Sequence, residues 1–329
     1  MSGSATGHAA RLTELQAYRP RIARPADLEA FWSSTLAEAR SHPISVEARP
    51  VESGLRLIDT WDVAFAGYGG QPIRAWLHRP AATRDALPVV VEYLGYNGAR
   101  GLPHERTAYA LAGYAHLVVD NRGGGAGWAV SDTPDDDPDA GLDTGGGRIT
   151  RGILAPETYF YRRAHTDAVR ALDAVAELSG VDPARVAVTG ISNGGGLAIA
   201  AAALGTPVTT VMADVPFLAH VVRAMTLSTR EPYLQLARYL QRNRTAVAAV
   251  ERTLSYVDVA NLAPLATAPA LFSVGLLDEI CPPESVFAAF HAWGGDDKRI
   301  EVYPYNGHEG GEEFQHVARL RWLADRLPI

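Results

Sequence analysis

The chain has 329 residues, of which 47% are hydrophobic, and it carries a formal net charge of −7. This length suits one large α/β domain better than two small ones. Because the charge is negative and the arginines are scattered along the chain, the composition argues against a nucleic-acid-binding protein.

The N-terminus and the cysteine content bear on where the protein works. Residues 1–10 are small and polar and lack the apolar stretch of a leader, so we expect a loose tail. No window approaches the ~18 consecutive apolar residues that a membrane span needs. The single cysteine, Cys281, rules out an intrachain disulfide. These features predict a cytoplasmic protein that does not enter a membrane.

The first elements in chain order are a helix and a hairpin. Residues 25–40 place apolar side chains at helical spacing, which predicts an amphipathic helix at the edge of the domain. Residues 55–78 alternate apolar and polar side chains on either side of a glycine-rich turn at 67–70. That alternation predicts an antiparallel hairpin.

From Pro88 onward the pattern changes to short, continuous apolar runs, each followed by a helical stretch. Such runs are typical of strands buried on both faces, so they predict a mostly parallel sheet with helices on both faces. The runs are 88–95, 115–121, 185–190, 209–215 and 270–275. The fold class is therefore α/β with an antiparallel N-terminal edge. We expect one domain over residues 1–329, in which the helical excursion at 216–264 is a candidate cap.

An acidic stretch at residues 131–147 is rich in Asp, Pro and Gly, which predicts a loop. Its aspartates at 135, 136, 137 and 139 raise the question of calcium binding. The spacing lacks the alternating Asp-x-Asp-x-Asp-Gly pattern and the late Glu of a calcium loop. We therefore expect a solvated loop without a metal.

Ser192 lies in the sequence Gly190-Ile191-Ser192-Asn193-Gly194. An apolar run precedes this motif and a helical run follows it, so strand, sharp turn and helix are predicted in succession. Glycines on both sides of the turn let the strand and the helix approach closely. This context predicts a nucleophilic serine raised above the sheet at a helix N-terminus.

A serine hydroxyl becomes a good nucleophile when a base takes its proton and a third group orients the base. His308 and Asp278 each follow an apolar run, so both fall at the carboxyl ends of strands, where open α/β sheets place their sites. The chain order Ser192, Asp278, His308 is that of the α/β-hydrolase fold and predicts acyl transfer. The alternative role of Asp278 is a helix N-cap before Pro282.

Acyl transfer also needs backbone N–H groups that bind the oxyanion. In this fold one N–H belongs to the residue after the nucleophile, here Asn193, and the other to a loop after an earlier strand. The glycine-rich run Leu94-Gly95-Tyr96-Asn97-Gly98 follows such a strand. We expect the second donor in that loop.

Three other residues with reactive side chains are weaker candidates. His165 falls on a predicted helix beside Arg163 and Asp167, which favours a structural role. His104 lies in a loop near the proposed site and is a minor candidate for substrate contact. Cys281 is close to Asp278 in sequence, and we interpret it as a small buried hydrophobe.

From about Phe31 to the C-terminus, the chain resembles the acetyl xylan esterase / cephalosporin-C deacetylase family, carbohydrate esterase family 7. The stretches that carry the resemblance are 95–98, 150–154, 159–163, 166–170, 253–256, 278–283, 286–289 and 303–311.

The resemblance implies a triad of Ser192, Asp278 and His308, and an oxyanion hole formed by the N–H groups of Tyr96 and Asn193. It further implies removal of acetyl groups from small acetylated sugars, xylo-oligosaccharides and cephalosporin-type esters, without a cofactor or metal. Members of the family are typically intracellular homohexamers, so the resemblance also implies that assembly.

The chain departs from the family pattern at three places. Leu94, Gly124 and Asn193 stand where the family usually has His, Gln and Gln, and these changes bear on substrate preference. Arg122, next to the second departure, is interpreted as a structural residue paired with a carboxylate.

Two alternative functions remain open from the residues alone. One is a peptidase of the prolyl-oligopeptidase type, whose catalytic domain shares the residue order, although the chain lacks room for the propeller that usually accompanies it. The other is a catalytically silent hydrolase fold that binds a small ligand, although silent members commonly lose a triad residue.

Overall fold

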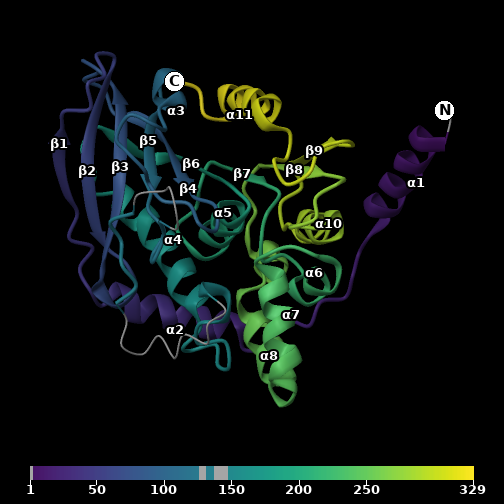
Figure 1. The fold of residues 1–329 in the computed structure, drawn as a ribbon. Helices are drawn as coiled ribbons and strands as arrows, with labels where there is room; N and C mark the ends of the chain where they lie inside the picture. Colours follow the sequence, from purple (N-terminus) through teal and green to yellow (C-terminus); the bar gives the residue numbers. More distant parts are fainter. Residues whose placement is uncertain (1–2, 126–130, 137–146) are drawn as a thin grey trace.

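The computed structural model describes residues 3–125, 131–136 and 147–329. Its centre is a nine-stranded sheet in the order β1-β2-β3-β5-β4-β6-β7-β8-β9 (Figure 1). The strands are β1 Glu47–Val51, β2 Ile58–Ala66, β3 Pro72–Pro80, β4 Leu87–Tyr93, β5 Ala115–Val119, β6 Val181–Ile191, β7 Thr210–Asp214, β8 Ala270–Gly275 and β9 Lys298–Tyr303.

The sheet has an antiparallel end and a parallel body. Strands β2 and β3 pair antiparallel around the glycine-rich turn, which confirms the predicted hairpin. Strand β3 also pairs antiparallel with β5, whereas the pairs from β5–β4 through to β8–β9 are parallel. The predicted α/β fold is confirmed. Strand β1 was not predicted, because most of its side chains are exposed and do not alternate.

Helices cover both faces of the sheet (Figure 1). Successive residues of a strand point to opposite faces. Val89 and Val91 of β4 belong to the large core that contains α4 and α5, whereas Val90 packs with Trp322 of α11 on the other face. The helices are α1 Gly3–Ala17, α2 Leu28–Arg40, α3 Ala108–Leu111, α4 Phe160–Val175, α5 Asn193–Leu204, α6 Val221–Leu227, α7 Tyr233–Arg242, α8 Val247–Val257, α9 Val259–Leu262, α10 Pro283–Ala292 and α11 Glu312–Arg326.

The N-terminal segment differs from the expected loose tail. Helix α1 begins at Gly3, so residues 3–10 are helical, while residues 1 and 2 lie outside the described part of the chain. Its later turns contain good helix formers, and the helix is held at its C-terminal end, where Leu15 is buried and its carbonyl lies 3.2 Å from a ring nitrogen of His291. This tertiary contact could not be read from a short polar stretch.

The excursion between β7 and β8 is helical, as the sequence predicts, and contains α6 to α9. Helices α7 and α8 extend away from the sheet (Figure 1). Tyr233 and Leu236 of α7, with Val250 and Leu254 of α8, are nevertheless buried in the same apolar core as the central strands. The excursion is therefore packed against the body of the fold.

Residues 131–136 form a loop, as predicted, in which Asp132, Pro134 and Asp136 are exposed, but the side chain of Asp135 is buried rather than solvated. The Asp135 carboxylate is 3% exposed and lies within ion-pair distance of Arg122, Arg151 and Arg163. Because these arginines come from three separate places in the sequence, the spacing of the aspartates gave no sign of the burial. Asp137 and Asp139 lie outside the described residues.

Among the helices of the described chain, none has the length and apolar character required to cross a bilayer.

Candidate functional site

Ser192 sits at a sharp turn between β6 and α5. Its backbone has φ 60° and ψ −118°, a left-handed conformation that is uncommon for residues other than glycine. Three backbone hydrogen bonds hold it: the Ser192 N–H donates to the Asp214 carbonyl (2.9 Å), and the Ser192 carbonyl accepts from Gly196 (3.0 Å) and Phe217 (2.9 Å). The strain is thus supported by β7 and by the first turn of α5.

The two glycines of the motif are required by space. A Cβ on Gly190 would lie 2.3 Å from the carbonyl carbon of Gly194, and a Cβ on Gly194 would lie 2.1 Å from the Tyr93 oxygen. The predicted role of these glycines, close approach of strand and helix, is therefore confirmed.

The three predicted side chains are linked in series by hydrogen bonds. His308 Nε2 lies 2.9 Å from Ser192 Oγ, and His308 Nδ1 lies 2.9 Å from Asp278 Oδ2. Because a carboxylate only accepts, Nδ1 carries the proton and the lone pair of Nε2 faces the serine hydroxyl. This is the arrangement in which a neutral imidazole can take a proton from serine.

Asp278 is a buried carboxylate with a full set of donors. Its Oδ1 accepts from the N–H groups of Ile280 (2.8 Å) and Cys281 (2.9 Å), which leaves Oδ2 for His308. The N-cap alternative is wrong, since α10 begins at Pro283 and has no side-chain cap.

The loops that carry Asp278 and His308 are packed against each other. The Leu276 and Leu277 N–H groups donate to the carbonyls of Tyr303 and Asn306, both at 3.0 Å. A Cβ on Gly275 would lie 2.2 Å from the Gly307 oxygen. Strands β8 and β9 therefore deliver the base and its orienting group to one place, as the carboxyl ends of adjacent parallel strands do.

The two predicted oxyanion donors are the backbone N–H groups of Asn193 and Tyr96. Asn193 heads α5, and Tyr96 lies in the loop after β4, which meets α5 where Gly194 touches Tyr93. Within the described residues, neither the Asn193 nor the Tyr96 N–H donates to a protein acceptor. The structure thus brings both predicted donors to the side of the sheet where Ser192 lies.

The three departures from the family pattern have structural explanations. Leu94 is buried with Trp76 and Val118, so an apolar contact stands where the family has an imidazole. A Cβ on Gly124 would lie 2.8 Å from the Gly98 oxygen, which leaves no room for a larger residue in this backbone. The Asn193 amide donates to the Leu94 carbonyl (3.0 Å) and accepts from the Tyr161 hydroxyl (2.9 Å).

Arg122 and His165 are structural, as interpreted from the sequence. Arg122 donates to both carboxylate oxygens of Asp167 (2.7 and 2.9 Å) and also contacts Gln71. His165 is buried against the rings of Trp32 and Tyr161, and burial lowers its pKa to about 3. Neither side chain is hydrogen-bonded to the serine, histidine and aspartate.

His104 and Cys281 have contrasting surroundings. His104 is exposed in the loop before α3. Burial raises the pKa of the Cys281 thiol well above its ordinary value, the nearby Asp278 carboxylate raises it further, and a hydrogen bond with Ser192 partly offsets the rise. Burial thus favours the protonated thiol, and Cys281 lies in the wall of the site, because its sulfur and the side-chain ligand atoms of Asp278 and His308 lie within 4.8 Å of one another.

Sequence reasoning missed four residues of this neighbourhood. Asn121, Tyr161, Phe217 and Tyr233 were not selected, although Asn121 lies two residues after the carboxyl end of strand β5. That position was the one available signal. The three aromatic residues come from helices or loops whose packing onto the site only the fold decides.

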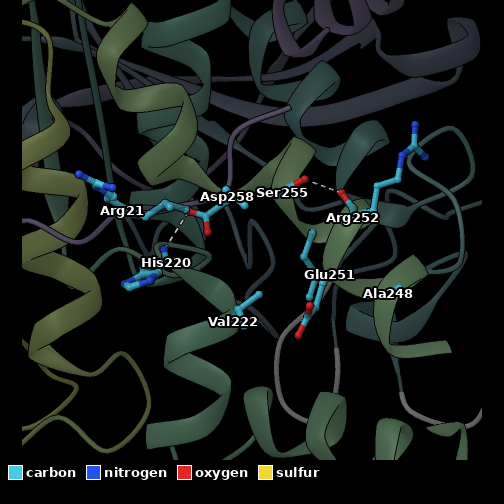
Figure 2. Close-up of a pocket in the computed structure, with 11 residues that line it drawn as sticks. Arg21, His220, Val222, Ala248, Glu251, Arg252, Ser255 and Asp258 are labelled. Atoms are coloured by element: carbon cyan, nitrogen blue, oxygen red, sulfur yellow. Dashed lines mark hydrogen bonds between the residues drawn. The ribbon is translucent and has the colours of Figure 1, made fainter. Parts of the chain in front are cut away.

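A cavity of about 450 Å³ lies apart from these residues (Figure 2). It is lined by the segment before α2 together with α6 and α8. The His220 N–H donates to the buried Asp258 carboxylate at its edge (Figure 2). Burial raises the pKa of Asp258 to about 6, although three backbone N–H groups oppose the rise. No residue of the Ser192 site lines this cavity.

Comparison with known proteins identifies the family. The model of the acetyl xylan esterase family matches residues 8–326. An acetyl xylan esterase from Paenibacillus sp. R4 is 35% identical and superposes with a TM-score of 0.89, covering 96% of this chain and 99% of its own. Acetyl xylan esterase 1 from Thermoanaerobacterium sp. JW/SL YS485 is 29% identical, with a TM-score of 0.83 and coverages of 94% and 96%.

More distant similarities agree. The acetyl esterase Axe7A of Xylanibacter ruminicola is 26% identical over 94% of this chain and 69% of its own length. An acylaminoacyl peptidase from Pyrococcus horikoshii is 15% identical with a TM-score of 0.63, over 84% of this chain and 43% of its own, which shows a shared fold alone. The chain belongs to the acetyl xylan esterase family and is a carboxylic ester hydrolase of the α/β-hydrolase fold.

Proposed function

We propose that the protein is a serine esterase that removes acetyl groups from small acetylated sugars, including xylo-oligosaccharides, and from cephalosporin-type acetyl esters. The observation that carries the proposal is the chain of two 2.9 Å hydrogen bonds from Ser192 Oγ through His308 to Asp278. The remaining steps follow from the chemistry of this arrangement.

In the first step, Ser192 Oγ attacks the acetyl carbonyl carbon while His308 Nε2 takes the hydroxyl proton. The carbonyl oxygen becomes an oxyanion and accepts hydrogen bonds from the N–H groups of Tyr96 and Asn193. His308 then gives its proton to the departing alcohol oxygen as the C–O bond breaks, which leaves an acetyl group on Ser192.

In the second step, water attacks the acetyl-enzyme and gives a proton to His308. The second oxyanion collapses, Ser192 Oγ leaves as it recovers the proton, and acetate is released. Asp278 remains ionised throughout, holds the proton of His308 on Nδ1 and stabilises the imidazolium that forms twice in each cycle.

A wall of aromatic side chains supports a preference for a short acyl group. The Phe217 N–H donates to the Ser192 carbonyl, and its ring lies 4.6 Å from the Tyr233 ring and 6.3 Å from the Tyr161 ring, centroid to centroid. All three are buried, and Cys281 contacts Ser192 from the same core. Acetate fits beside such packing, whereas a long acyl chain would have to displace it.

We propose the sugar and cephalosporin substrates because the chain resembles the family and because its relatives are named as acetyl xylan esterases and an acetyl esterase. The same resemblance underlies two further proposals, a homohexameric assembly and a cytoplasmic location. The location is supported by the single, buried, unpaired cysteine. Sedimentation equilibrium of the purified protein tests the assembly: a monomer at micromolar concentration would contradict it.

The activity is tested with p-nitrophenyl esters from acetate to octanoate, with Ser192→Ala as the blank. We expect acetate to be preferred, and then acetylated xylo-oligosaccharides and cephalosporin C to release acetate at rates that require Ser192. Preference for octanoate would contradict the short acyl site. Faster cleavage of aminoacyl amides than of acetyl esters would contradict the esterase proposal in favour of a peptidase.

A further inference from the structure

The loop that contains Tyr96 is held from one side by a single amide. Asn121 Nδ2 lies within hydrogen-bond distance of three backbone carbonyls of this loop: Gly95 (2.7 Å), Gly98 (3.0 Å) and Leu94 (3.3 Å). Asn121 follows strand β5 and is 8% exposed. A side chain from the segment after β5 therefore binds three carbonyls of this loop.

Because the Gly95–Tyr96 peptide unit is planar, holding the Gly95 carbonyl also restricts the direction of the Tyr96 N–H. The Gly95 carbonyl and the Tyr96 N–H belong to one peptide unit, which is planar and trans, so the two groups point in opposite directions. When Asn121 holds the Gly95 oxygen, the Tyr96 N–H must point away from Asn121. The Gly95 oxygen also accepts from the Gly98 N–H (2.9 Å), so the shortest of the three Asn121 contacts acts together with this turn to fix the direction of the proposed oxyanion donor.

Two neighbouring residues, Gly124 and Asn193, also contact this part of the loop. A Cβ on Gly124 would lie 2.8 Å from the backbone oxygens of both Asn121 and Gly98, so the lack of a side chain at Gly124 lets the segment after β5 approach the loop. The Asn193 side chain donates to the Leu94 carbonyl as well (3.0 Å). The Leu94 carbonyl therefore links the supports of both oxyanion donors.

We propose that Asn121 is a positioning residue of the oxyanion hole, which aims the Tyr96 N–H by binding the carbonyl of the same peptide. Leu94 brings no polar side chain to this loop, and the Asn121 amide supplies the polar support instead. Asn121 does not touch the substrate. The inference rests on the proposed serine mechanism, because it concerns an N–H that is used only when an oxyanion forms.

The test uses the full-length protein and a transition-state analogue. A methyl trifluoromethyl ketone adds to the serine as a hemiketal whose oxyanion occupies the hole, so its affinity reports on the N–H donors. Asn121→Ala removes the amide, and Asn121→Asp keeps its size but replaces the donor by an acceptor. In both variants we expect kcat for p-nitrophenyl acetate to fall about 10- to 100-fold with KM nearly unchanged. The inhibition constant of the ketone should rise by the factor by which kcat/KM falls.

A matched control separates positioning from general destabilisation. Asn261 is also buried, and its Nδ2 donates to the carbonyls of Ala23 and Ser255, both at 2.9 Å, away from the Ser192 site. Asn261→Ala should lower the melting temperature without changing the ketone affinity of the folded protein. If Asn121→Ala does not fold, the ketone affinities of Asn121→Asp and Asn121→Ser are compared with that of the wild type instead.

Two results overturn the inference. One is a ketone affinity of the Asn121 variants equal to that of the wild type, and the other is a loss of activity that appears only in KM. Failure of the proposed function is recognised separately, because Ser192→Ala would then retain wild-type turnover. Loss of activity in Ser192→Ala together with unchanged ketone binding in Asn121→Asp would reject the role of Asn121 alone.

Discussion

Two buried polar clusters of this protein use the same kinds of group in different ways. In the Ser192, His308 and Asp278 chain, the histidine side chain is 29% exposed and its Nε2 faces a neutral hydroxyl. In the cluster around Arg122, the Arg122, Asp135 and Asp167 side chains are 0%, 3% and 7% exposed, and both carboxylates are paired with arginine. The first chain of residues can transfer a proton and is accessible at the histidine, whereas both carboxylates of the second are held in ion pairs with arginine.

The difference shows that burial and hydrogen bonding do not by themselves make a reactive site. Burial opposes ionisation of Asp135, but hydrogen bonds from Arg163 and the charges of Arg122 and Arg151 outweigh it and lower the pKa. Such a group stays charged at all ordinary pH values and holds three segments together. A general base works best when its pKa lies near the working pH, and the substrate must be able to reach the nucleophile beside it. The predictions below test this division between chemistry and stability.

The largest effect is expected at the serine. Ser192→Ala should lower kcat for p-nitrophenyl acetate by roughly 10⁴- to 10⁶-fold, because the nucleophile is lost and only binding and the oxyanion hole remain. The melting temperature should stay close to that of the wild type, since the backbone bonds of Ser192 do not involve its side chain. A variant that turns over at the wild-type rate would show that another group is the nucleophile.

The next effect is on stability and should spare the chemistry. Arg122→Met leaves Asp167 buried without its bidentate partner, so the free energy of unfolding should fall by about 3–5 kcal/mol, measured by urea denaturation. The folded fraction should keep kcat within a few-fold of the wild type. Arg40→Met is the matched control: the Arg40 side chain is 42% exposed and Asp173 keeps Arg170 as a second partner, so the loss should be less than about 1 kcal/mol. Equal losses in both variants would remove the distinction between the clusters.

A smaller effect is expected from pH. Burial lowers the pKa of His165 from 6.5 to about 3. Between these two pH values the imidazole is therefore neutral in the folded protein and protonated in the unfolded chain. The contribution of the neutral ring to stability is complete above pH 6.5 and is lost progressively as the pH falls towards 3. In His165→Leu, the urea midpoint should therefore fall less steeply between pH 7 and 4 than in the wild type. Parallel slopes would contradict this, and His104→Leu, at an exposed histidine, provides the control.

The smallest effect is expected at Tyr161. Its hydroxyl donates to the Asn193 side chain, whose backbone N–H is the second proposed oxyanion donor. Tyr161→Phe leaves that amide oxygen short of a donor in a buried place, so we expect a loss of about 1–2 kcal/mol in stability and a fall in kcat of less than about tenfold. Tyr256→Phe removes the hydrogen bond to Asp27 far from the site and should leave kcat unchanged. A larger fall in Tyr161→Phe than in Asn121→Ala would reverse the proposed importance of the two supports.

Much of the parallel part of the fold could be predicted because its strands are short continuous apolar runs, each followed by a helical stretch. The turn at Ser192 was also recognisable from local sequence. The strand and the helix approach so closely there that Gly190 and Gly194 have no room for a side chain, and this requirement is visible as two glycines at a strand-to-helix junction. Strand β1 was missed because its exposed residues bury nothing and so have no pattern. Helix α1 was missed because packing of Leu15, not local composition, holds its end.

The sequence by itself determined the order and local context of Ser192, Asp278 and His308, since strand, turn and loop signals are encoded by neighbours in the chain. Only the tertiary structure decided what supports them. Asp135 is buried among three arginines that lie 13 to 28 residues away in the sequence. Asn121 binds three carbonyls that lie 23 to 27 residues away. Such contacts depend on strand register and helix packing, and no periodicity in the sequence records them.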